Sequence, residues 1–191
     1  MKGDTAVVFA RAPRLGTVKR RLARGIGAMA ALRFYRGALA RTLREVGRDR
    51  RWRAVVAVTP DRARWRVGLP CVPQGRGDLG VRMARALKLA RRVVIVGSDI
   101  PGLRRTDVAD AFRALGRADA VFGPAEDGGY WLVGLGVRRP EHPFAGVRWS
   151  SEDALADTVA NFRGRRVAML RTLRDVDVVE DLREVAAWGA A

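Results

Sequence analysis

The sequence is poor in residues that mark several protein classes. Its only cysteine is Cys71, which excludes a disulfide-stapled secreted scaffold and a zinc site built from several cysteines. Its only histidine, His142, lies among prolines in a predicted loop, and we assign it no role. The first apolar stretch has only about five residues before Arg11, too few for a signal peptide or for the roughly 18 that span a bilayer. We therefore expect a cytoplasmic protein without a membrane partner.

Acidic residues and lysines are scarce too. The chain has 20 Asp and Glu against 37 Lys and Arg, a formal net charge of +17, which attracts polyanions over long range. Only Lys2, Lys19 and Lys88 are lysines, and the arginines are spread along the chain instead of forming a tail or strip. This spread favours solvated surface arginines, leaves attraction of phosphorylated ligands as an alternative, and argues against nucleic acid as the partner.

What the chain does have is an alternation of short apolar runs and longer helical patterns. This alternation is typical of an α/β fold with a mostly parallel sheet between helices. With 191 residues, 48% of them hydrophobic, one domain over residues 1–191 is expected. The predicted strands are Thr5–Ala10, Trp52–Val58, Leu69–Val72, Val93–Val96, Ala120–Phe122, Tyr130–Leu135 and Val167–Leu170. The predicted helices are Ile26–Val46, Asp78–Ala90, Thr106–Leu115, Asp153–Phe162 and Val178–Trp188.

Apolar spacing also predicts buried helix faces and one strand pair. The strand Tyr130–Leu135 is expected to pair with the strand that precedes it. The first predicted helix aligns Leu32, Tyr35, Leu39 and Leu43, and the second aligns Leu79, Met83, Leu87 and Ala90.

A basic loop follows the first predicted strand, from Phe9 to Gly27. Pro13 and Gly16 prevent a regular helix early in it, and the Walker A spacing is absent. A solvated basic turn is one interpretation, but α/β nucleotide folds place phosphates at this first turn. Its exposed amides would bind a polyphosphate together with four basic side chains, Arg14, Lys19, Arg20 and Arg21.

One carboxylate, Asp99, closely follows the strand Val93–Val96. Gly97 and Pro101 end that strand, so Asp99 lies at its carboxyl end, where open α/β sheets bind ligands. Mg²⁺ or Mn²⁺ prefers carboxylate oxygens and bridges to substrate phosphates, so few protein ligands are required. The alternative is an aspartate that caps the following turn. Ser98 is a poor nucleophile candidate because the first glycine of G-x-S-x-G is missing.

Two carboxylates, Glu126 and Asp127, stand beside Gly128 and Gly129 between two predicted strands. The Asp-Gly pair is a strong hairpin signal, which explains these residues without a function. Alternatively, one carboxylate orients an acceptor hydroxyl or takes its proton, and the glycines let the backbone approach a ligand closely.

A second acidic group, Asp175 and Asp177, precedes the last predicted helix. Asp177 with Glu180 matches a capping box, which is an ordinary helix start. In an extended segment, however, Asp175 and Asp177 lie on the same side, so they would complete a metal site with Asp99.

Two further segments give weaker signals. Gln74 to Gly80 is a glycine-rich entry to a helix, with Asp78 as its expected N-cap. Ser150 and Ser151 are capping candidates before another helix.

Six segments carry a combined pattern: ARAPRLGTVKRRL, QGRGDLG, VGSDIPGL, FGPAEDGGYWLVGL, FAGVRWSS and DVDVVEDL. In order and spacing, over roughly Ala6 to Val185, they resemble a bacterial family of nucleotide-diphospho-sugar-transferase-like proteins. That family is described as glycosyltransferases linked with arsenosugar biosynthesis or radical-SAM gene neighbourhoods. More distantly, the chain resembles guanylyltransferases that activate phospholactate or phosphoenolpyruvate, and molybdenum-cofactor nucleotidyltransferases.

The resemblance implies a three-layer α/β/α, Rossmann-like GT-A fold, a nucleotide-bound substrate and a divalent cation. It maps metal ligands onto Asp99, Asp175 and Asp177, and phosphate binding onto the loop with Lys19 and Arg21. Where the family has Lys-x-Pro and Lys-Thr-Arg-Leu, this chain has Arg11-Ala12-Pro13 and Lys19-Arg20-Arg21-Leu22, which keep the charge but lose a threonine hydroxyl. The nucleotide-binding residues expected from these segments are Arg11, Pro13, Gly16, Lys19, Arg21, Gln74, Gly77, Asp78, Gly80 and Ser98.

The leading hypothesis is transfer of a sugar from a nucleotide sugar to a small acceptor. Mg²⁺ or Mn²⁺, with Lys19 and Arg21, would stabilise charge on the diphosphate leaving group, and Asp127 or Glu126 would position or deprotonate the acceptor. The alternative is nucleotidyl transfer from a nucleoside triphosphate to a phosphorylated small molecule. A third hypothesis is a non-catalytic binder of nucleotides or nucleic acid.

Overall fold

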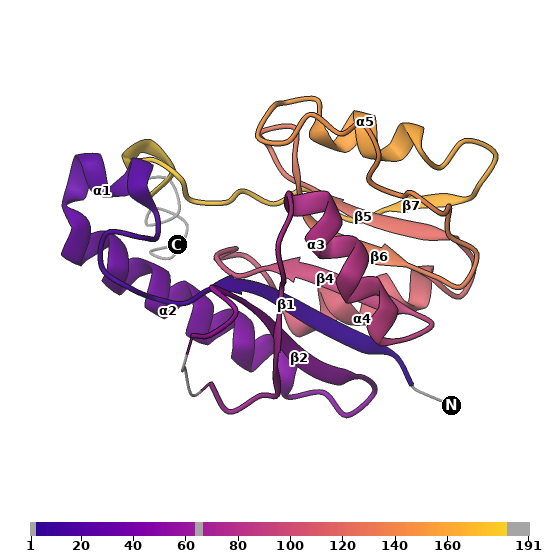
Figure 1. The fold of residues 1–191 in the computed structure, drawn as a ribbon, viewed down its shortest axis with the longest axis horizontal. Coiled ribbons are helices and arrows are strands. Elements are labelled where there is room, and N and C mark those ends of the chain that lie inside the picture. The colour runs from indigo at the N-terminus through magenta and orange to yellow at the C-terminus, as the bar shows by residue number, and fades with distance from the viewer. Residues whose placement is uncertain (1–2, 64–66, 183–191) are drawn as a thin grey trace.

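The computed structural model describes residues 3–63 and 67–182. In this part of the chain seven strands form one sheet, and helices cover both of its faces (Figure 1). The strands are β1 Thr5–Arg11, β2 Arg53–Thr59, β3 Cys71–Pro73, β4 Val93–Gly97, β5 Ala120–Pro124, β6 Tyr130–Leu135 and β7 Val167–Met169. The helices are α1 Arg20–Ile26, α2 Ala28–Gly47, α3 Leu79–Ala86, α4 Arg105–Ala114 and α5 Ala154–Ala160, and a 3-10 turn, η1, covers Leu87–Leu89.

The strand order is β3-β2-β1-β4-β6-β5-β7. β1 pairs in parallel with β2 and with β4, and β7 pairs in parallel with β5. β6 runs antiparallel to both of its neighbours, β4 and β5. The sheet is therefore mixed and mostly parallel, and the predicted pairing of Tyr130–Leu135 with the preceding strand is confirmed.

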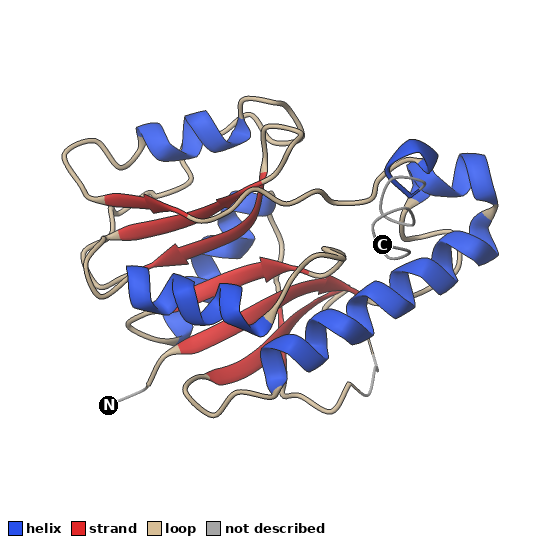
Figure 2. Cartoon of the chain, turned by 180° about the vertical axis from the view of Figure 1, so that it is seen from behind, coloured by secondary structure: helices blue, strands red, loops and turns tan. Residues whose placement is uncertain are grey.

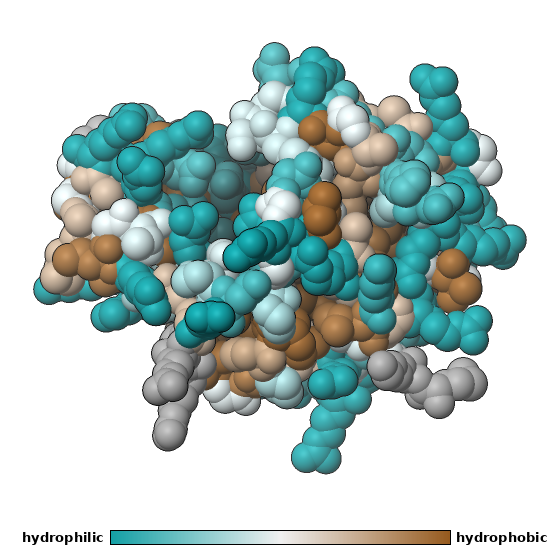
Figure 3. All heavy atoms as spheres, in the orientation of Figure 1, coloured by the Kyte–Doolittle hydropathy of each residue, from teal (hydrophilic) through white to brown (hydrophobic). Residues whose placement is uncertain are grey.

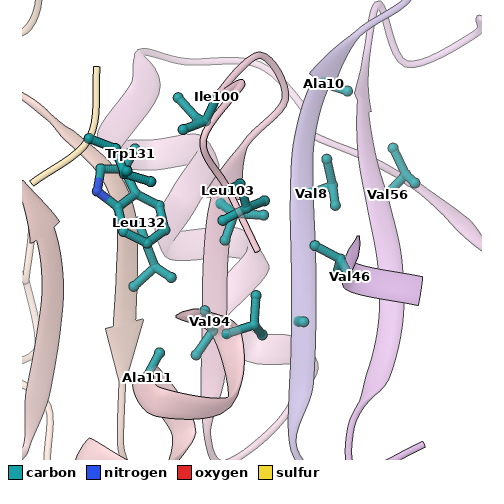
Figure 4. Packing of buried hydrophobic residues seen from close by; sticks show 14 of the residues in the cluster. Val8, Ala10, Val46, Val56, Val94, Ile100, Leu103, Ala111, Trp131 and Leu132 are labelled. Atoms are coloured by element: carbon teal, nitrogen blue, oxygen red, sulfur yellow. The ribbon is translucent and has the colours of Figure 1, made fainter. Parts of the chain in front are cut away.

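Both faces of the central strands are buried because successive side chains alternate between two apolar clusters. Val8 and Val94 belong to the cluster that contains the inner faces of α2 and α4. Their chain neighbours Val7 and Ile95 belong to the cluster that contains α3. Figure 2 shows the long helix α2 lying across the first face, and Figure 4 shows part of the first cluster. Each fully buried valine or isoleucine contributes about 1.5–3 kcal/mol, so the two faces hold the three layers together.

The predicted elements agree with these elements except at a few points. The predicted basic loop contains a short helix, α1, which begins at Lys19 with a left-handed backbone (φ 46°) and no side-chain cap. Without a capping residue or a long apolar stripe, the sequence gives little sign of this helix. The second predicted helix ends earlier, at Ala86, and Leu79 is 38% exposed instead of buried.

The segment after β7 crosses the molecule and connects the sheet to α1 (Figure 1). Leu173 forms a parallel bridge with Ala125, beyond the end of β5. Val176 is fully buried in a third cluster with Leu22 of α1 and Ala31 of α2. The segment thereby runs past the carboxyl ends of the central strands. Residues 179–182 are helical, as predicted, and the rest of the predicted helix Val178–Trp188 lies outside the described residues.

Within the described ranges, no helix combines the length and the apolar character needed to cross a membrane.

Candidate active site

The candidate site lies between the carboxyl ends of β1 and β4. These two parallel strands are neighbours, and the chain leaves β1 toward β2, which lies on its other side. Such a reversal of strand order opens a crevice between the loops that follow the two strands, and open α/β sheets bind ligands there. The loop after β1 ends at Lys19, and the loop after β4 contains Ser98 and Asp99.

Lys19 and Asp99 meet at this crevice. Lys19 Nζ lies 2.6 Å from Asp99 Oδ2 and donates a hydrogen bond of 2.8 Å to Asp177 Oδ1. Its side chain is only 5% exposed, whereas that of Asp99 is 25% exposed. Two of the three predicted metal ligands therefore surround one buried ammonium group from the predicted phosphate loop.

The protonated form of Lys19 is held by these contacts. Burial alone would lower the pKa of its ammonium group, but the negative charges of Asp99 and Asp177 outweigh that cost and raise the pKa above its ordinary value. The left-handed backbone at Lys19 is rare for a residue with a Cβ, and such conformations persist where the surroundings fix them. Lys19 is thus a fixed positive charge at neutral pH.

Ser98 and Tyr35 form a polar support beneath the crevice. The Tyr35 hydroxyl donates to Arg11 O at 2.8 Å, accepts from Arg11 N at 3.0 Å, and lies 3.2 Å from Ser98 Oγ. Burial raises the pKa of Tyr35, so this hydroxyl stays protonated. Ser98 and the backbone of Arg11, two predicted nucleotide-binding positions, therefore fix the ends of β4 and β1.

Asp177 contacts the basic loop instead of capping its own helix. Its carboxylate binds Lys19, and its Oδ2 lies 3.8 Å from the guanidinium of Arg21, whose side chain is 69% exposed. Asp181 Oδ2 accepts hydrogen bonds from the backbone N–H groups of Asp177 and Val178 at 2.9 Å each. The carboxylate that serves the helix start therefore comes from Asp181, not from Glu180.

Asp175, the third predicted metal ligand, is half-buried and near the other carboxylates. Burial is the main cause that raises its pKa from 3.8 to about 6, and the negative charge of Asp177 adds to the shift. Within the described ranges, no group of three or more His, Cys, Asp or Glu side chains is arranged to hold a metal ion. The carboxylate oxygens are of the kind that Mg²⁺ or Mn²⁺ prefers, and the unfavourable charge on Asp175 is what a nearby cation would relieve.

A cavity of about 150 Å³ lies beside these carboxylates. Its lining includes Asp127, Asp175, Tyr130, Trp131, Trp149 and Ser150. We call it the acidic cavity. It combines β6, the turn before it and the loop that precedes α5. In the space-filling view a hollow with hydrophilic atoms at its floor lies between α1 and α3 (Figure 3).

The two carboxylates of the predicted turn have different surroundings. Asp127 lines the acidic cavity, and its Oδ1 accepts a 2.9 Å hydrogen bond from Gly129 N. Glu126 forms an ion pair of 2.5 Å with Arg174 and does not line the cavity. Gly128 has a left-handed backbone (φ 83°), and a Cβ on it would lie 2.0 Å from Glu152 O. Gly128 therefore allows close packing of this turn against the loop before α5.

The glycine-rich segment before α3 has mainly structural contacts. Gln74 is buried, and its amide nitrogen donates to Ala10 O at 3.1 Å and to Ala57 O at 2.8 Å. Asp78 caps α3 by accepting from Val81 N, as predicted. A Cβ on Gly80 would lie 2.9 Å from Phe144 Cβ and 3.0 Å from Trp149 Cζ2. Gly77 has a positive φ of 109° and lies beside Val81.

The remaining predicted residues belong to the basic stretch that follows β1. We call residues 11–24 the basic segment; it has six basic side chains and no acidic one. Gly16, Arg20 and Arg24 line a surface hollow of about 280 Å³. Pro13 instead lines a separate cavity of about 760 Å³ against α2, away from the carboxylates.

The loop before α5 contributes to the acidic cavity, which was not expected from the sequence. Ser150 has φ 64°, a conformation that a serine rarely adopts, and Trp149 forms one wall of the acidic cavity. Arg148 holds this loop on α5 through ion pairs of 2.7 Å to Asp153 and 2.9 Å to Asp157. The signal that could have indicated this loop is the segment FAGVRWSS of the family resemblance, whereas the serines by themselves indicated only helix capping.

Comparisons with known proteins show the family and the fold of the chain. Residues 42–151, which include Asp99 and Asp127, match the model of the family described as "Uncharacterized protein conserved in bacteria (DUF2064)". The chain is similar to a candidate nucleotide-diphospho-sugar transferase from Desulfovibrio desulfuricans G20, with 31% identity and a TM-score of 0.90 over 97% of this chain and 87% of that chain. No curated protein matches the sequence significantly.

Two more distant structures share the fold. Rv0371C of Mycobacterium tuberculosis H37Rv in complex with manganese has 18% identity and a TM-score of 0.54, over 96% of this chain and 97% of that chain. CMP:2-keto-3-deoxy-manno-octonic acid synthetase complexed with CTP has 10% identity and a TM-score of 0.61, over 98% of both chains. The chain therefore belongs to the DUF2064 family and has a nucleotide-diphospho-sugar-transferase-like fold.

Proposed function

We propose that the protein is a transferase that takes a sugar from a nucleotide sugar and passes it to a small acceptor. The main support for this proposal is the contact between Lys19 and Asp99 in the crevice between β1 and β4, where the strand order reverses. The cavity that contains Asp127 lies directly beside this contact. A fixed cation at such a crevice suits a diphosphate, and a carboxylate in the adjacent cavity suits a hydroxyl. The resemblance to a candidate nucleotide-diphospho-sugar transferase supports the same reaction class.

Lys19 and Arg21 would stabilise the diphosphate leaving group. Negative charge grows on the oxygen that leaves the sugar, and a cation already fixed there lowers the barrier without moving. Lys19 fits this role because Asp99 and Asp177 fix its position before any ligand binds. Arg21, which is largely exposed, suits the outer phosphate.

A divalent cation would be held by Asp99, with Asp175 and Asp177 as further oxygen ligands. The donor set fits Mg²⁺ or Mn²⁺, which keep several waters and take other ligands from substrate phosphates. Such a cation would add positive charge beside the diphosphate oxygens. Asp99 retains one oxygen, Oδ1, without a hydrogen-bond partner in the described part of the chain, and Lys19 occupies the other.

Asp127 is the carboxylate that we propose for the acceptor. It lines the acidic cavity, and its Oδ1 is oriented by the backbone N–H of Gly129, which leaves Oδ2 for a hydroxyl proton. Glu126 is held by Arg174 and lies outside the cavity lining. This contrast favours Asp127 over Glu126.

Nucleotidyl transfer from a nucleoside triphosphate is the second candidate. The observation that favours it is the basic segment, whose exposed arginines provide more positive charge than a diphosphate alone requires. Both reactions break a bond to a phosphate chain, so the same residues would serve either one. They differ in the leaving group, which is a nucleoside diphosphate in sugar transfer and pyrophosphate in nucleotidyl transfer.

A thermal-shift panel tests the proposal. UDP-glucose, GDP-mannose, CTP, GTP and UTP are added with and without Mn²⁺, and a nucleotide at about 100 times its Kd should add about 2.7 kcal/mol of stability. The variant Asp99→Asn should lose the Mn²⁺-dependent part of the shift. Asp110→Asn, which removes a carboxylate from the exposed face of α4, is the matched control.

Three outcomes decide between the hypotheses. No shift with any nucleotide in the presence of Mn²⁺ contradicts both transfer reactions. A shift that Asp99→Asn leaves intact contradicts the metal assignment. Salt-sensitive binding to DNA or RNA without any effect of small nucleotides would favour the non-catalytic binder instead.

A further inference from the structure

We propose that the acidic cavity selects an uncharged, hydroxyl-bearing small molecule as the acceptor and disfavours phosphorylated or carboxylated ones. The inference rests on the transferase function proposed above and adds the chemical class of the second substrate. It separates the acceptor expected in sugar transfer from the phosphorylated acceptor of the nucleotidyl alternative.

The charge of the lining carries the first step. Asp127 and Asp175 line the cavity, and none of the residues that form its lining is basic. This is unusual in a chain with 37 Lys and Arg and a net charge of +17. A phosphate ester placed there would face the carboxylate of Asp127, with no basic side chain in the lining to compensate it, and such juxtaposition is how binding sites reject anions.

The walls of the cavity carry the second step. The rings of Tyr130 and Trp149 meet edge to face with centroids 6.4 Å apart, and Trp131 forms part of the same lining. Trp131 is 2% exposed and its indole N–H donates to Arg171 O at 3.2 Å, so Trp131 backs the cavity from the core, and Tyr130 and Trp149 provide the ring surface. Apolar ring surface beside carboxylate oxygens matches a ligand with C–H groups on one side and hydroxyl groups on another.

The loop before α5 adds a fixed polar group. Ser150 lines the cavity with φ 64°, and its hydroxyl has no hydrogen-bond partner within the described residues. Arg148 holds the loop through Asp153 and Asp157, so the strained backbone is maintained. A hydroxyl both donates and accepts, and it can therefore pair with an acceptor hydroxyl without favouring an anion.

The size of the cavity limits the ligand. Its volume of about 150 Å³ lies below the range of about 300–1,000 Å³ that is typical of pockets for drug-sized molecules. A small polyol or a single sugar ring is the size class that this volume favours.

The transfer step balances with these groups. The acceptor hydroxyl oxygen forms a bond to the transferred carbon while the bond from that carbon to the diphosphate oxygen breaks. The bonding electron pair leaves with the nucleoside diphosphate, and Asp127 Oδ2 receives the hydroxyl proton. A neutral hydroxyl therefore supplies all that the proposed reaction needs.

Matched ligand pairs test the selectivity by calorimetry or ligand-observed NMR. Glycerol and glucose are compared with glycerol 3-phosphate and glucose 6-phosphate, each with and without UDP and Mn²⁺. We expect the neutral member of each pair to bind at least about tenfold more tightly, because the Asp127 carboxylate repels the phosphate. Asp127→Asn should reduce this ratio at least about threefold and leave the nucleotide-induced thermal shift unchanged.

Two further variants distinguish the selectivity of the acidic cavity from the effect of removing any surface charge and from a loss of folding. Glu141→Gln removes a carboxylate that is 90% exposed, so it should keep the ratio of the wild type. Trp149→Leu should weaken the neutral ligands several-fold while the nucleotide shift persists. Circular dichroism and the melting temperature without ligand show whether each variant is folded.

The possible results distinguish this inference from the proposed function. Phosphorylated ligands that bind as tightly as their neutral partners, or a ratio that Asp127→Asn leaves unchanged, would overturn the inference. Nucleotides that bind while all four acceptor probes fail at 100 mM would also overturn it, and the proposed function would stand. Selective binding of neutral ligands without any nucleotide binding would contradict the proposed function but not the selectivity of the cavity.

Discussion

The basic segment and the acidic cavity are neighbours at one edge of the sheet, but they carry opposite charges. Residues 11–24 contain six basic side chains and no acidic one, whereas the cavity lining contains Asp127 and Asp175 and no basic side chain. Apart from the buried Lys19, the basic side chains of this segment are exposed, with Arg21 at 69%. This difference suits two ligands: the acidic cavity would repel a phosphate chain, and the basic segment has no carboxylate to hold a neutral hydroxyl.

The segment after β7 joins the two regions. Asp177 binds Lys19, Asp175 lines the cavity, and Val176 between them is fully buried against α1 and α2. Residues two apart in an extended segment share a side, so both carboxylates lie opposite the buried valine. The same short segment therefore fixes the cation of one region and supplies negative charge to the other.

The largest effect is expected from Lys19→Ala. It removes the fixed cation from the basic side and should lower kcat/KM of the transfer reaction about 10²–10³-fold, the usual loss for one group that stabilises a developing anion. Steady-state kinetics with the donor found in the thermal-shift panel measures the loss. Lys88→Ala, which removes an exposed lysine from η1, is the matched control. A loss below about tenfold would show that Lys19 only neutralises Asp99 and Asp177.

A smaller effect is expected from Asp127→Asn on the acidic side. Loss of a group that orients or deprotonates the acceptor should lower kcat about 10²-fold. Glu126→Gln is the adjacent comparison, since Glu126 is paired with Arg174 and lies outside the cavity lining. We expect the loss for Asp127→Asn to exceed that for Glu126→Gln at least about tenfold. Equal losses in the two variants would mean that the turn as a whole matters and not the Asp127 carboxylate.

Most of the sheet could be predicted from the sequence because buried parallel strands are continuous apolar runs. Val93–Val96 has four such residues in a row, and all four are buried in β4. The short helix α1 could not be predicted, since it begins with a left-handed residue and depends on packing against Val176. Leu79 follows the helical spacing but is exposed, because α3 begins at the edge of the acidic cavity.

The candidate site was predictable as a set of residues but not as a set of contacts. The strand ends placed Lys19 and Asp99 in loops that meet, and the spacing of Asp175 and Asp177 placed them on one side. That the Lys19 ammonium group lies between Asp99 and Asp177 depends on where the segment after β7 packs, 158 residues along the chain, which no local pattern in the sequence reveals. The acidic cavity combines side chains from distant segments, so no local pattern indicated it.

Asp175, which lies where the two regions join, should make the free energy of unfolding depend on pH. Folding raises the pKa of Asp175 from 3.8 to about 6, first through burial and then through the charge of Asp177. The folded protein therefore binds more protons than the unfolded chain between these values, so its free energy of unfolding falls as the pH rises through this range. After discounting for partial exposure, we expect a fall of about 2 kcal/mol, complete above pH 7.

Asp175→Asn tests this dependence. The variant should lack this fall and be more stable than the wild type at pH 7.5, as measured by urea unfolding in EDTA at pH 4.5, 5.5, 6.5 and 7.5. Glu141→Gln should keep the slope of the wild type, because its carboxylate is exposed. Parallel curves for Asp175→Asn and the wild type would show that Asp175 keeps an ordinary pKa.

The smallest effect is expected from Gly80→Ala, and it tests to which of the two regions Gly80 belongs. A Cβ there would lie 2.9 Å from Phe144 Cβ and 3.0 Å from Trp149 Cζ2. The Trp149 ring is half-buried and can shift, but Phe144 Cβ moves only with its backbone, which makes the overpacking costly. Because alanine in a helix recovers part of that cost, we expect a net stability loss of about 1 kcal/mol and a melting temperature lower by about 2–4 °C. Gly37→Ala in α2, where a Cβ meets nothing within 4 Å, is the matched control and should not destabilise the fold.

If Gly80 only packs beneath Trp149, the variant weakens acceptor binding several-fold and leaves the nucleotide-induced shift intact. Loss of the nucleotide shift instead would place Gly80 in the nucleotide site, as its sequence motif predicts, and the boundary between the two regions would lie on the other side of α3.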